Sequence, residues 1–183
     1  MGNILSPKPV KLFVGMLAAL PEGLDRSTEI LVGEYGKTDL ESNVIPFGFT
    51  SYYKKEMGPS LLRKFLSFEE LIQPDQIATI KCRTNTIEKD LTETLDANVQ
   101  RPVNLDPGYL NPSRIVLATT KDFSHRIYLS HGIYAEVTLQ HIRGRWQALP
   151  WTYPDYKSEA YYEFFSDMRK ICMRQMAQQE ESN

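Results

Sequence analysis

The sequence predicts a single α+β domain with a mainly antiparallel sheet and about three main helices packed on it. Its 183 residues suffice for one domain, which we expect to span 1–183 with frayed ends over about 1–7 and 178–183. Short apolar runs bounded by Pro and Gly predict strands, and two of the turns between them are short enough for hairpins. Longer segments repeat apolar residues at helical spacing.

Composition excludes several classes of protein. Hydrophobic residues make up 42% and aromatic residues 11% of the chain, which excludes a disordered protein. The net charge of −2 lacks the basic excess of a general nucleic-acid binder. No run approaches the ~20 apolar residues that span a bilayer. Cys82 and Cys172 show no zinc or CxxC spacing and are expected as reduced thiols, so the sequence predicts a cytoplasmic protein without a membrane partner.

The first elements are defined by apolar runs and by their stop signals. The run over 10–19 predicts a core strand. Asp25 suits the N-cap of a helix that ends at Tyr35, because Gly36 supplies a left-handed stop. Later strands are expected over 44–49, 61–68 and 115–118.

Two further helices follow from the spacing of apolar residues. Pro74 suits the first turn of the second helix, whose apolar positions are Ile77, Ile80, Thr84, Ile87, Leu91 and Leu95. The C-terminal helix carries an apolar stripe of Tyr161, Phe164, Phe165, Met168, Ile171, Cys172 and Met176. Between these helices, Asp106-Pro107-Gly108 predicts a tight turn, with Pro and Gly in their preferred central places.

The most informative local pattern is the hairpin from His125 to Val137. A three-residue loop, Ser130-His131-Gly132, is expected to set its register. The resulting pairs are Leu129 with Ile133, Ile127 with Ala135, Tyr128 with Tyr134, and Arg126 with Glu136. A second hairpin turns at Arg143-Gly144.

The two hairpins have two different faces. The core face is expected to carry Val137, Leu139, Trp146 and Ala148. The opposite face is expected to carry Arg126, Tyr128, Tyr134, Glu136 and Thr138. Two interpretations of that polar face stay open, namely a solvated sheet surface and the floor of a site.

The segment 33–38 (GEYGKT) contains the Gly-Lys-Thr of a phosphate loop but not its context. The Walker pattern needs four residues between its glycines and a preceding strand. Here only two residues separate Gly33 from Gly36, and a helix precedes them. We therefore expect no GTP binding at this segment. No motif in the chain supports NAD, zinc or haem either.

Polar residues at strand ends and on one helix form the candidate site. The catalytic candidates are His125, whose imidazole titrates near neutral pH, with Lys121 and Asp106. The substrate-binding candidates are Arg126, Tyr128, Tyr134, Glu136, Lys81 and Asn85. Asp106 and Glu136 are also the candidates for a divalent cation such as Mg²⁺, which prefers oxygen ligands. A surface charge cluster, a turn cap or a solvated helix face explains the same residues equally well.

Two of these local patterns have a structural alternative of their own. Lys81, Asn85 and Glu88 share one helix stripe, on which Lys81 and Glu88 can share the intervening Asn85. The aromatic segment 151–156 (WTYPDY) is expected either to cover a pocket or to pack over the last helix.

Several blocks of residues in order resemble one family. They are Pro46-Phe47, Thr50-x-Tyr52-Tyr53-x-x-Glu56-Met57-Gly58, Ser67-Phe68-Glu69, Ile80-Lys81 with Thr84-Asn85 and Glu88, Val103–Leu110, Leu117–Asp122, His125–Leu129, Gly132–Leu139 and Trp151–Tyr156. This pattern resembles the bacterial family known as domain of unknown function 4416, from about Pro9 to Gln175. The resemblance implies a small bacterial cytoplasmic protein and names no activity. Ser51 and Lys54 stand where the family pattern leads us to expect acidic residues, so neither is a site candidate.

The leading hypothesis is an enzyme or ligand-binding protein that acts on a small anionic metabolite with a phosphate or carboxylate group. Lys and Arg side chains can hold such a group, Arg by a bidentate pair. One rival is a module that binds RNA or a ribonucleoprotein, based on the basic residues Lys121, Arg126, Arg143 and Arg145 near Tyr128, Tyr134 and Trp146. Another rival is a scaffold protein whose aromatic segments pack against a partner.

Overall fold

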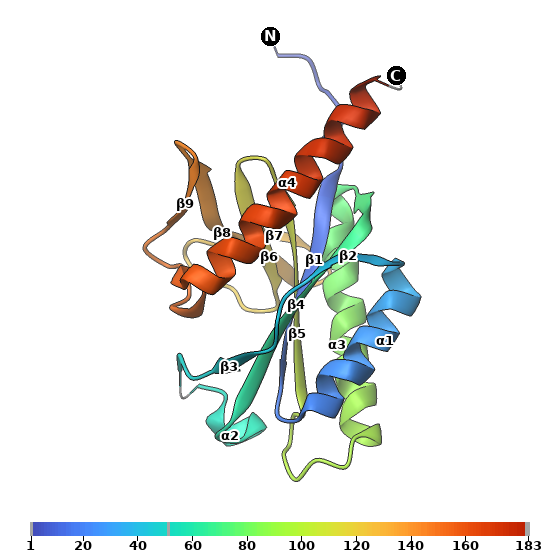
Figure 1. Cartoon of the computed structure of the whole chain (residues 1–183), viewed down its shortest axis with the longest axis vertical. Coiled ribbons are helices and arrows are strands. Elements are labelled where there is room, and N and C mark those ends of the chain that lie inside the picture. The colour runs from blue at the N-terminus through green and yellow to red at the C-terminus, as the bar shows by residue number, and fades with distance from the viewer. Residues whose placement is uncertain (1, 51, 182–183) are drawn as a thin grey trace.

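One antiparallel sheet forms the centre of the structure, a computed structural model that describes residues 2–50 and 52–181 (Figure 1). Within those ranges the strand order is β2-β4-β1-β5-β6-β8-β7, with β3 beside β4 and β9 beside β8. The strands are β1 (Val10–Ala18), β2 (Thr38–Glu41), β3 (Ile45–Phe47), β4 (Leu61–Ile72), β5 (Val103–Asn111), β6 (Arg114–Thr119), β7 (Ile127–Ser130), β8 (Ile133–Ile142) and β9 (Arg145–Ala148).

Helices cover both faces of the sheet. The helices are α1 (Pro21–Tyr35), α2 (Lys54–Met57), α3 (Ile77–Thr94) and α4 (Glu159–Glu181), with short 3₁₀ turns η1 (Pro74–Gln76) and η2 (Asp155–Lys157). One face packs Leu24 and Leu31 of α1 and Ile87 of α3 into a core cluster. The other face packs Tyr161 and Phe165 of α4 into a second cluster, and α4 crosses the sheet diagonally in Figure 1. The predicted α+β class with three main helices is confirmed.

Helix boundaries differ from the expected ones at two places. Helix α1 begins at Pro21 and not after Asp25, because Pro occupies the first helical position, where its missing N–H costs nothing. It ends as predicted before Gly36, whose φ is 85°. Helix α4 continues to Glu181, so residues 178–181 are helical and not part of a frayed tail. No helix in the described ranges is both long and apolar enough to cross a membrane.

The predicted turn at Asp106-Pro107-Gly108 is wrong, since all three residues lie inside β5. Antiparallel partners for the segment come from β1, where Val14 pairs with Pro107. The ladder between β5 and β6 starts only at Gly108, so the missing N–H of Pro107 lies on a side without a strand partner. Gly108 is required where β5 and β6 approach, because a Cβ there would lie 2.5 Å from the carbonyl oxygen of Val116.

The β7–β8 hairpin keeps the predicted register over most of its length but has a different turn. Ile127 pairs with Ala135 and Tyr128 with Tyr134, as predicted. The predicted Leu129–Ile133 pair is wrong: Ser130 faces Ile133, and Leu129 is the extra residue of a bulge. The turn consists of His131 and Gly132, both with positive φ (53° and 75°), which suits a two-residue hairpin. The bulge restores the register that a two-residue turn alone would shift.

The second hairpin turns at Arg143-Gly144 as predicted, with Ile142 paired to Arg145. Its expected core face is right for Leu139 and Trp146, which are buried, but Ala148 is exposed. The opposite face is not uniformly solvated. Tyr128 is 57% exposed, whereas Glu136 and Thr138 are buried at 2% and 0%. A bulge at Thr138, between the pairs Ile115–Leu139 and Val116–Val137, accompanies this change.

Candidate functional site

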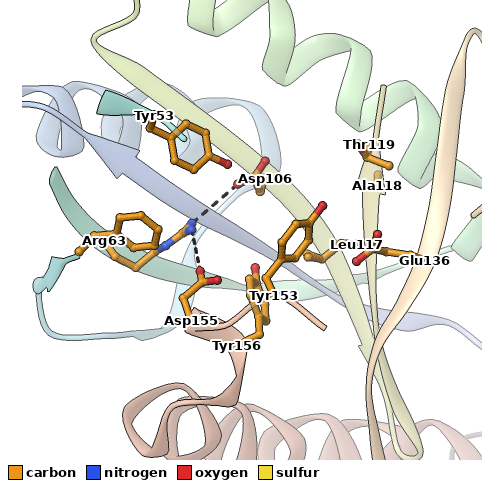
Figure 2. Close-up of a pocket in the computed structure, with 11 residues that line it drawn as sticks. Tyr53, Arg63, Asp106, Leu117, Ala118, Thr119, Glu136, Tyr153, Asp155 and Tyr156 are labelled. Carbon is orange, nitrogen blue, oxygen red and sulfur yellow. Dashed lines mark hydrogen bonds and ion pairs between the residues drawn. The ribbon is translucent and has the colours of Figure 1, made fainter. Parts of the chain in front are cut away.

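A pocket of about 60 Å³ opens on the α4 side of the sheet, where β5 and β6 separate (Figure 2). Strands β3 to β6 and β8 supply part of its wall, and the segments before α2 and around η2 supply the rest. Its lining residues are Phe47, Tyr53, Arg63, Asp106, Leu117, Ala118, Thr119, Glu136, Tyr153, Asp155 and Tyr156.

Arg63 is the buried cation of the pocket, with 2% of its surface exposed. Its Nε donates to the Tyr161 hydroxyl at 3.0 Å, and its Nη2 donates to Oδ2 of Asp155 at 3.2 Å. Its Nη1 lies 3.8 Å from Oδ2 of Asp106 and, within the described chain, has no hydrogen-bond partner. Figure 2 shows the guanidinium between these two carboxylates. One strong donor of Arg63 is therefore left for a ligand.

Asp106 is held at the opening between β5 and β6 by helix α3. Lys81 Nζ donates to the carbonyl oxygen of Leu105 at 2.7 Å and lies 3.7 Å from Oδ1 of Asp106. Glu88 Oε1 accepts from the backbone N–H of Leu105, also at 2.7 Å. Asn104 Nδ2 donates to Oδ2 of Asp106 at 2.6 Å. Two side chains of α3 thus satisfy the backbone of Leu105 where β6 is absent.

Glu136 lies on the β8 wall of the pocket and joins two of the predicted residues. Its Oε2 accepts from Arg126 Nε at 2.8 Å and lies 3.1 Å from His125 Nε2. Its Oε1 has a longer hydrogen bond from the Thr138 hydroxyl at 3.3 Å. Arg126 Nη2 in turn donates to the Tyr153 hydroxyl at 2.6 Å. The predicted Arg126–Glu136 contact across the hairpin is therefore present as an ion pair.

Two tyrosine hydroxyls add donors to the pocket. Burial, together with the charge of Glu136, raises the pKa of Tyr153 to about 12, so this phenol is protonated at neutral pH. Because its oxygen already accepts from Arg126, its proton is available to a ligand. Tyr156 is 2% exposed, and burial raises the pKa of its hydroxyl well above the usual value. That hydroxyl has no hydrogen-bond partner in the described part of the chain.

Asp155 completes the buried charges around Arg63. Burial raises the pKa of its carboxyl group, and the nearby Arg63 guanidinium opposes that shift. The Arg63–Asp155 contact at 3.2 Å connects strand β4 with the segment of η2. The pocket therefore has charged groups on opposite walls, all of them held by elements far apart in the sequence.

The predicted site residues divide into three groups. Asp106 and Glu136 line the pocket. Three other predicted residues do not line it but contact these carboxylates: His125 and Arg126 contact Glu136, and Lys81 contacts Asp106. Lys121 contacts Tyr52 rather than Asp106. Its Nζ donates to the Tyr52 hydroxyl and lies 4.4 Å from the centre of the Tyr52 ring. Tyr128, Tyr134 and Asn85 do not line the pocket either.

Other expectations for single residues have clear outcomes. Tyr128 and Tyr134 pack against each other on the hairpin, with their ring centres 5.4 Å apart. Lys81 Nζ lies 4.0 Å from Oε1 of Glu88, and both side chains bind the backbone of Leu105 rather than Asn85. Lys54 begins α2, and Ser51 lies outside the described residues.

Sequence patterns alone missed Arg63 and Tyr53 as pocket residues, and they indicated Tyr153, Asp155 and Tyr156 only as part of the aromatic segment 151–156. A usable signal existed for Arg63, because it alternates with Leu61 and Phe65 and so lies on the buried face of its strand. The aromatic segment 151–156 does both of the things expected of it. Tyr153 lines the pocket, and Tyr156 stacks on Phe165 of α4 with ring centres 5.8 Å apart.

The carboxylates of the pocket are engaged by cationic side chains. Within the described residues, no group of three or more His, Cys, Asp or Glu side chains is arranged to hold a metal ion. Asp106 lies beside Lys81, and Glu136 beside Arg126. Each of these two candidates for a cation ligand therefore already has a cationic side chain beside it.

The fold and the pocket define an α+β protein with a buried, charged pocket at a break in its sheet. The chain belongs to the family described as Domain of unknown function (DUF4416), whose model matches residues 8–171. The match covers every strand and all of α1, α2 and α3. No curated protein and no solved structure shows a significant similarity to the chain.

Proposed function

We propose that this protein binds a small metabolite through a carboxylate group, with Arg63 as the anchor. One observation carries the proposal: a buried guanidinium lines the pocket while its Nη1 has no hydrogen-bond partner in the described chain. Leaving a buried donor of this kind unsatisfied costs ~1–3 kcal/mol, so a ligand that accepts from it recovers that free energy. In the same pocket, the Tyr156 hydroxyl also has no hydrogen-bond partner among the residues that the structure describes.

The electrostatics of the pocket favour a carboxylate over a phosphate. Asp106, Glu136 and Asp155 all line the pocket, and a phosphate dianion would face repulsion from all three. A carboxylate carries one charge, and its two oxygens can accept separately from Arg63 Nη1 and the Tyr156 hydroxyl, the two unpartnered donors of the described residues in this pocket. The volume of about 60 Å³ accommodates a small group of this kind and little more.

Burial also favours a small ligand over RNA. The RNA alternative relies on exposed basic and aromatic side chains that reach phosphates and bases. Trp146 is only 6% exposed, and its Nε1 donates to Ser166. The Arg126 guanidinium donates to Glu136 and Tyr153, so these donors are already used within the protein and not free for a phosphate of RNA.

The test is calorimetric titration of the full chain with acetate, propionate and inorganic phosphate. We expect saturable binding of a carboxylate, weaker or absent binding of phosphate, and at least a tenfold loss of carboxylate affinity in Arg63→Lys. Lysine keeps the charge but not the planar donors. The matched control is Arg83→Lys, because Arg83 is a half-buried residue outside the pocket and is paired with Glu34.

Arg63→Lys is interpreted only if its near-ultraviolet circular dichroism matches that of the unchanged protein. Tyr156→Phe provides a second variant, since it removes one donor and no charge. The proposal would be overturned if folded Arg63→Lys and Tyr156→Phe both bound the carboxylate as tightly as the unchanged protein does. It would also be overturned if phosphate bound more tightly than any carboxylate.

A further inference from the structure

The pocket has unused acceptors as well as unused donors. Oδ1 of Asp106 has Lys81 Nζ as its nearest cation at 3.7 Å, which is beyond hydrogen-bond distance. Among the described residues, Oε1 of Glu136 accepts only from the Thr138 hydroxyl, at 3.3 Å. Carboxylate oxygens have about two acceptor positions each. Both atoms therefore have capacity for a donor that the protein does not supply.

The charges around the pocket already balance before any ligand binds. Asp155 lies 3.2 Å from Arg63, Glu136 lies 2.8 Å from Arg126, and Asp106 lies 3.7 Å from Lys81. A ligand that is only an anion adds an uncompensated negative charge beside these carboxylates, and buried unpaired charge is costly. A ligand that carries one positive and one negative group adds no net charge.

Donors and acceptors are also on different walls. The unpartnered donors belong to Arg63 on β4 and to Tyr156 in η2. The unused acceptors belong to Asp106 on β5 and Glu136 on β8. Figure 2 shows the Arg63 guanidinium and Glu136 toward opposite ends of the pocket, with Tyr153 between them. Because Oδ2 of Asp106 lies 3.8 Å from Arg63 Nη1, the site matches a molecule whose acid and amine groups lie close together.

We propose that the ligand is an α-amino acid, an inference that rests on the proposed function. Its carboxylate accepts from Arg63 Nη1 and the Tyr156 hydroxyl, and its ammonium group donates to Asp106 and Glu136. The pocket has room for this common part of an amino acid, so the side chain extends toward the opening. Tyr153, which is 39% exposed, lines that opening.

The test compares three matched ligands on the full chain. Each of the twenty standard amino acids is first titrated by calorimetry. The tightest one is then compared with the acid that lacks its amino group and with the amine that lacks its carboxylate. We expect the amino acid to bind at least tenfold more tightly than either partial compound.

Asp106→Asn supplies the matching variant, with Asp122→Asn as control because Asp122 is exposed in a neighbouring loop. We expect Asp106→Asn to weaken binding of the amino acid, and to leave binding of the plain acid as tight or tighter because one repelling charge is gone. If the plain acid binds as tightly as the amino acid, the amino acid assignment is wrong and the carboxylate proposal stands. If neither the amino acids nor the plain acids bind, both fail.

Discussion

Nη1 of Arg63 lies 3.8 Å from Oδ2 of Asp106, although their strands, β4 and β5, lie on either side of β1. The contact passes over Gly15, which pairs with Asp106 on one side and with Phe65 on the other. A Cβ at Gly15 would lie 3.1 Å from Arg63 Nη1 and 2.9 Å from the Phe65 ring. Because Gly15 in the middle strand has no side chain, the Arg63 side chain can cross β1 and reach Asp106.

Gly15→Ala is expected to destabilise the fold and to displace Arg63. The added methyl group overpacks the contact with Phe65, a change that costs ~1–3 kcal/mol in a packed core. The matched control is Gly33→Ala in α1, where a Cβ would meet nothing within 4 Å. That change should stabilise the helix by ~0.5–1 kcal/mol. Urea unfolding of the three proteins measures both effects, and a gain in stability for Gly15→Ala would contradict the argument.

Lys81→Met is expected to lower the free energy of unfolding by ~1.5–3 kcal/mol, the usual cost of losing a hydrogen bond to a charged group. The change removes the donor to the Leu105 carbonyl and the cation nearest Oδ1 of Asp106. Lys89→Met on the same helix is the control, because Lys89 is exposed. Its effect should stay within about 0.5 kcal/mol. Equal effects of the two substitutions in denaturant unfolding would show that Leu105 does not need Lys81.

Tyr35→Phe should leave stability at neutral pH unchanged or higher, because the Tyr35 hydroxyl is buried without a partner in the described chain. Burial, followed by the charge of Glu34, raises the pKa of Tyr35 to about 12. A raised pKa in the folded state gives stability that is complete below the unfolded value, near 10, and is lost as pH rises toward 12. The variant should therefore lose less stability between pH 10 and 12. Urea unfolding at a series of pH values measures the slopes, and parallel slopes would contradict the assignment.

GTP is not expected to bind at Gly36-Lys37-Thr38. These residues follow the C-terminus of α1, where the helix dipole is negative and carbonyl groups are exposed. A phosphate loop instead directs several backbone N–H groups at the start of a helix. Calorimetry with GTP and Mg²⁺ should show no saturable binding that depends on Lys37. Micromolar binding that is abolished by Lys37→Ala would contradict this expectation.

The elements with strong local signals were predictable from the sequence. The β1 strand, the end of α1 at Gly36, and the apolar stripe of α4 follow from periodicity and stop signals. The Asp106-Pro107-Gly108 segment has the local composition of a turn, but strand pairing with β1 outweighs that preference. The Leu129 bulge was missed because a two-residue turn with one bulged residue gives the same pairing of Ile127 and Tyr128 as a three-residue loop without a bulge.

The candidate site was only partly predictable because its contacts are distant in sequence. Glu136 and Arg126 are neighbours on one hairpin, so a local register places them together. Arg63 and Asp155 are 92 residues apart, and no local pattern indicates that they meet. A charged residue on the buried face of a strand, as at Arg63, is the signal that such a distant partner exists.

The break between β5 and β6 forms a cavity but does not leave an unpaired strand edge that could pair with another chain. Unpaired strand backbone normally attracts other chains, and sheets that end abruptly are sites of aggregation. At Leu105 the free N–H and C=O groups are occupied by Glu88 and Lys81, so neither is left to pair with a strand from another molecule. Helix α3 therefore occupies the strand backbone at the same position where the sheet opens to form the pocket.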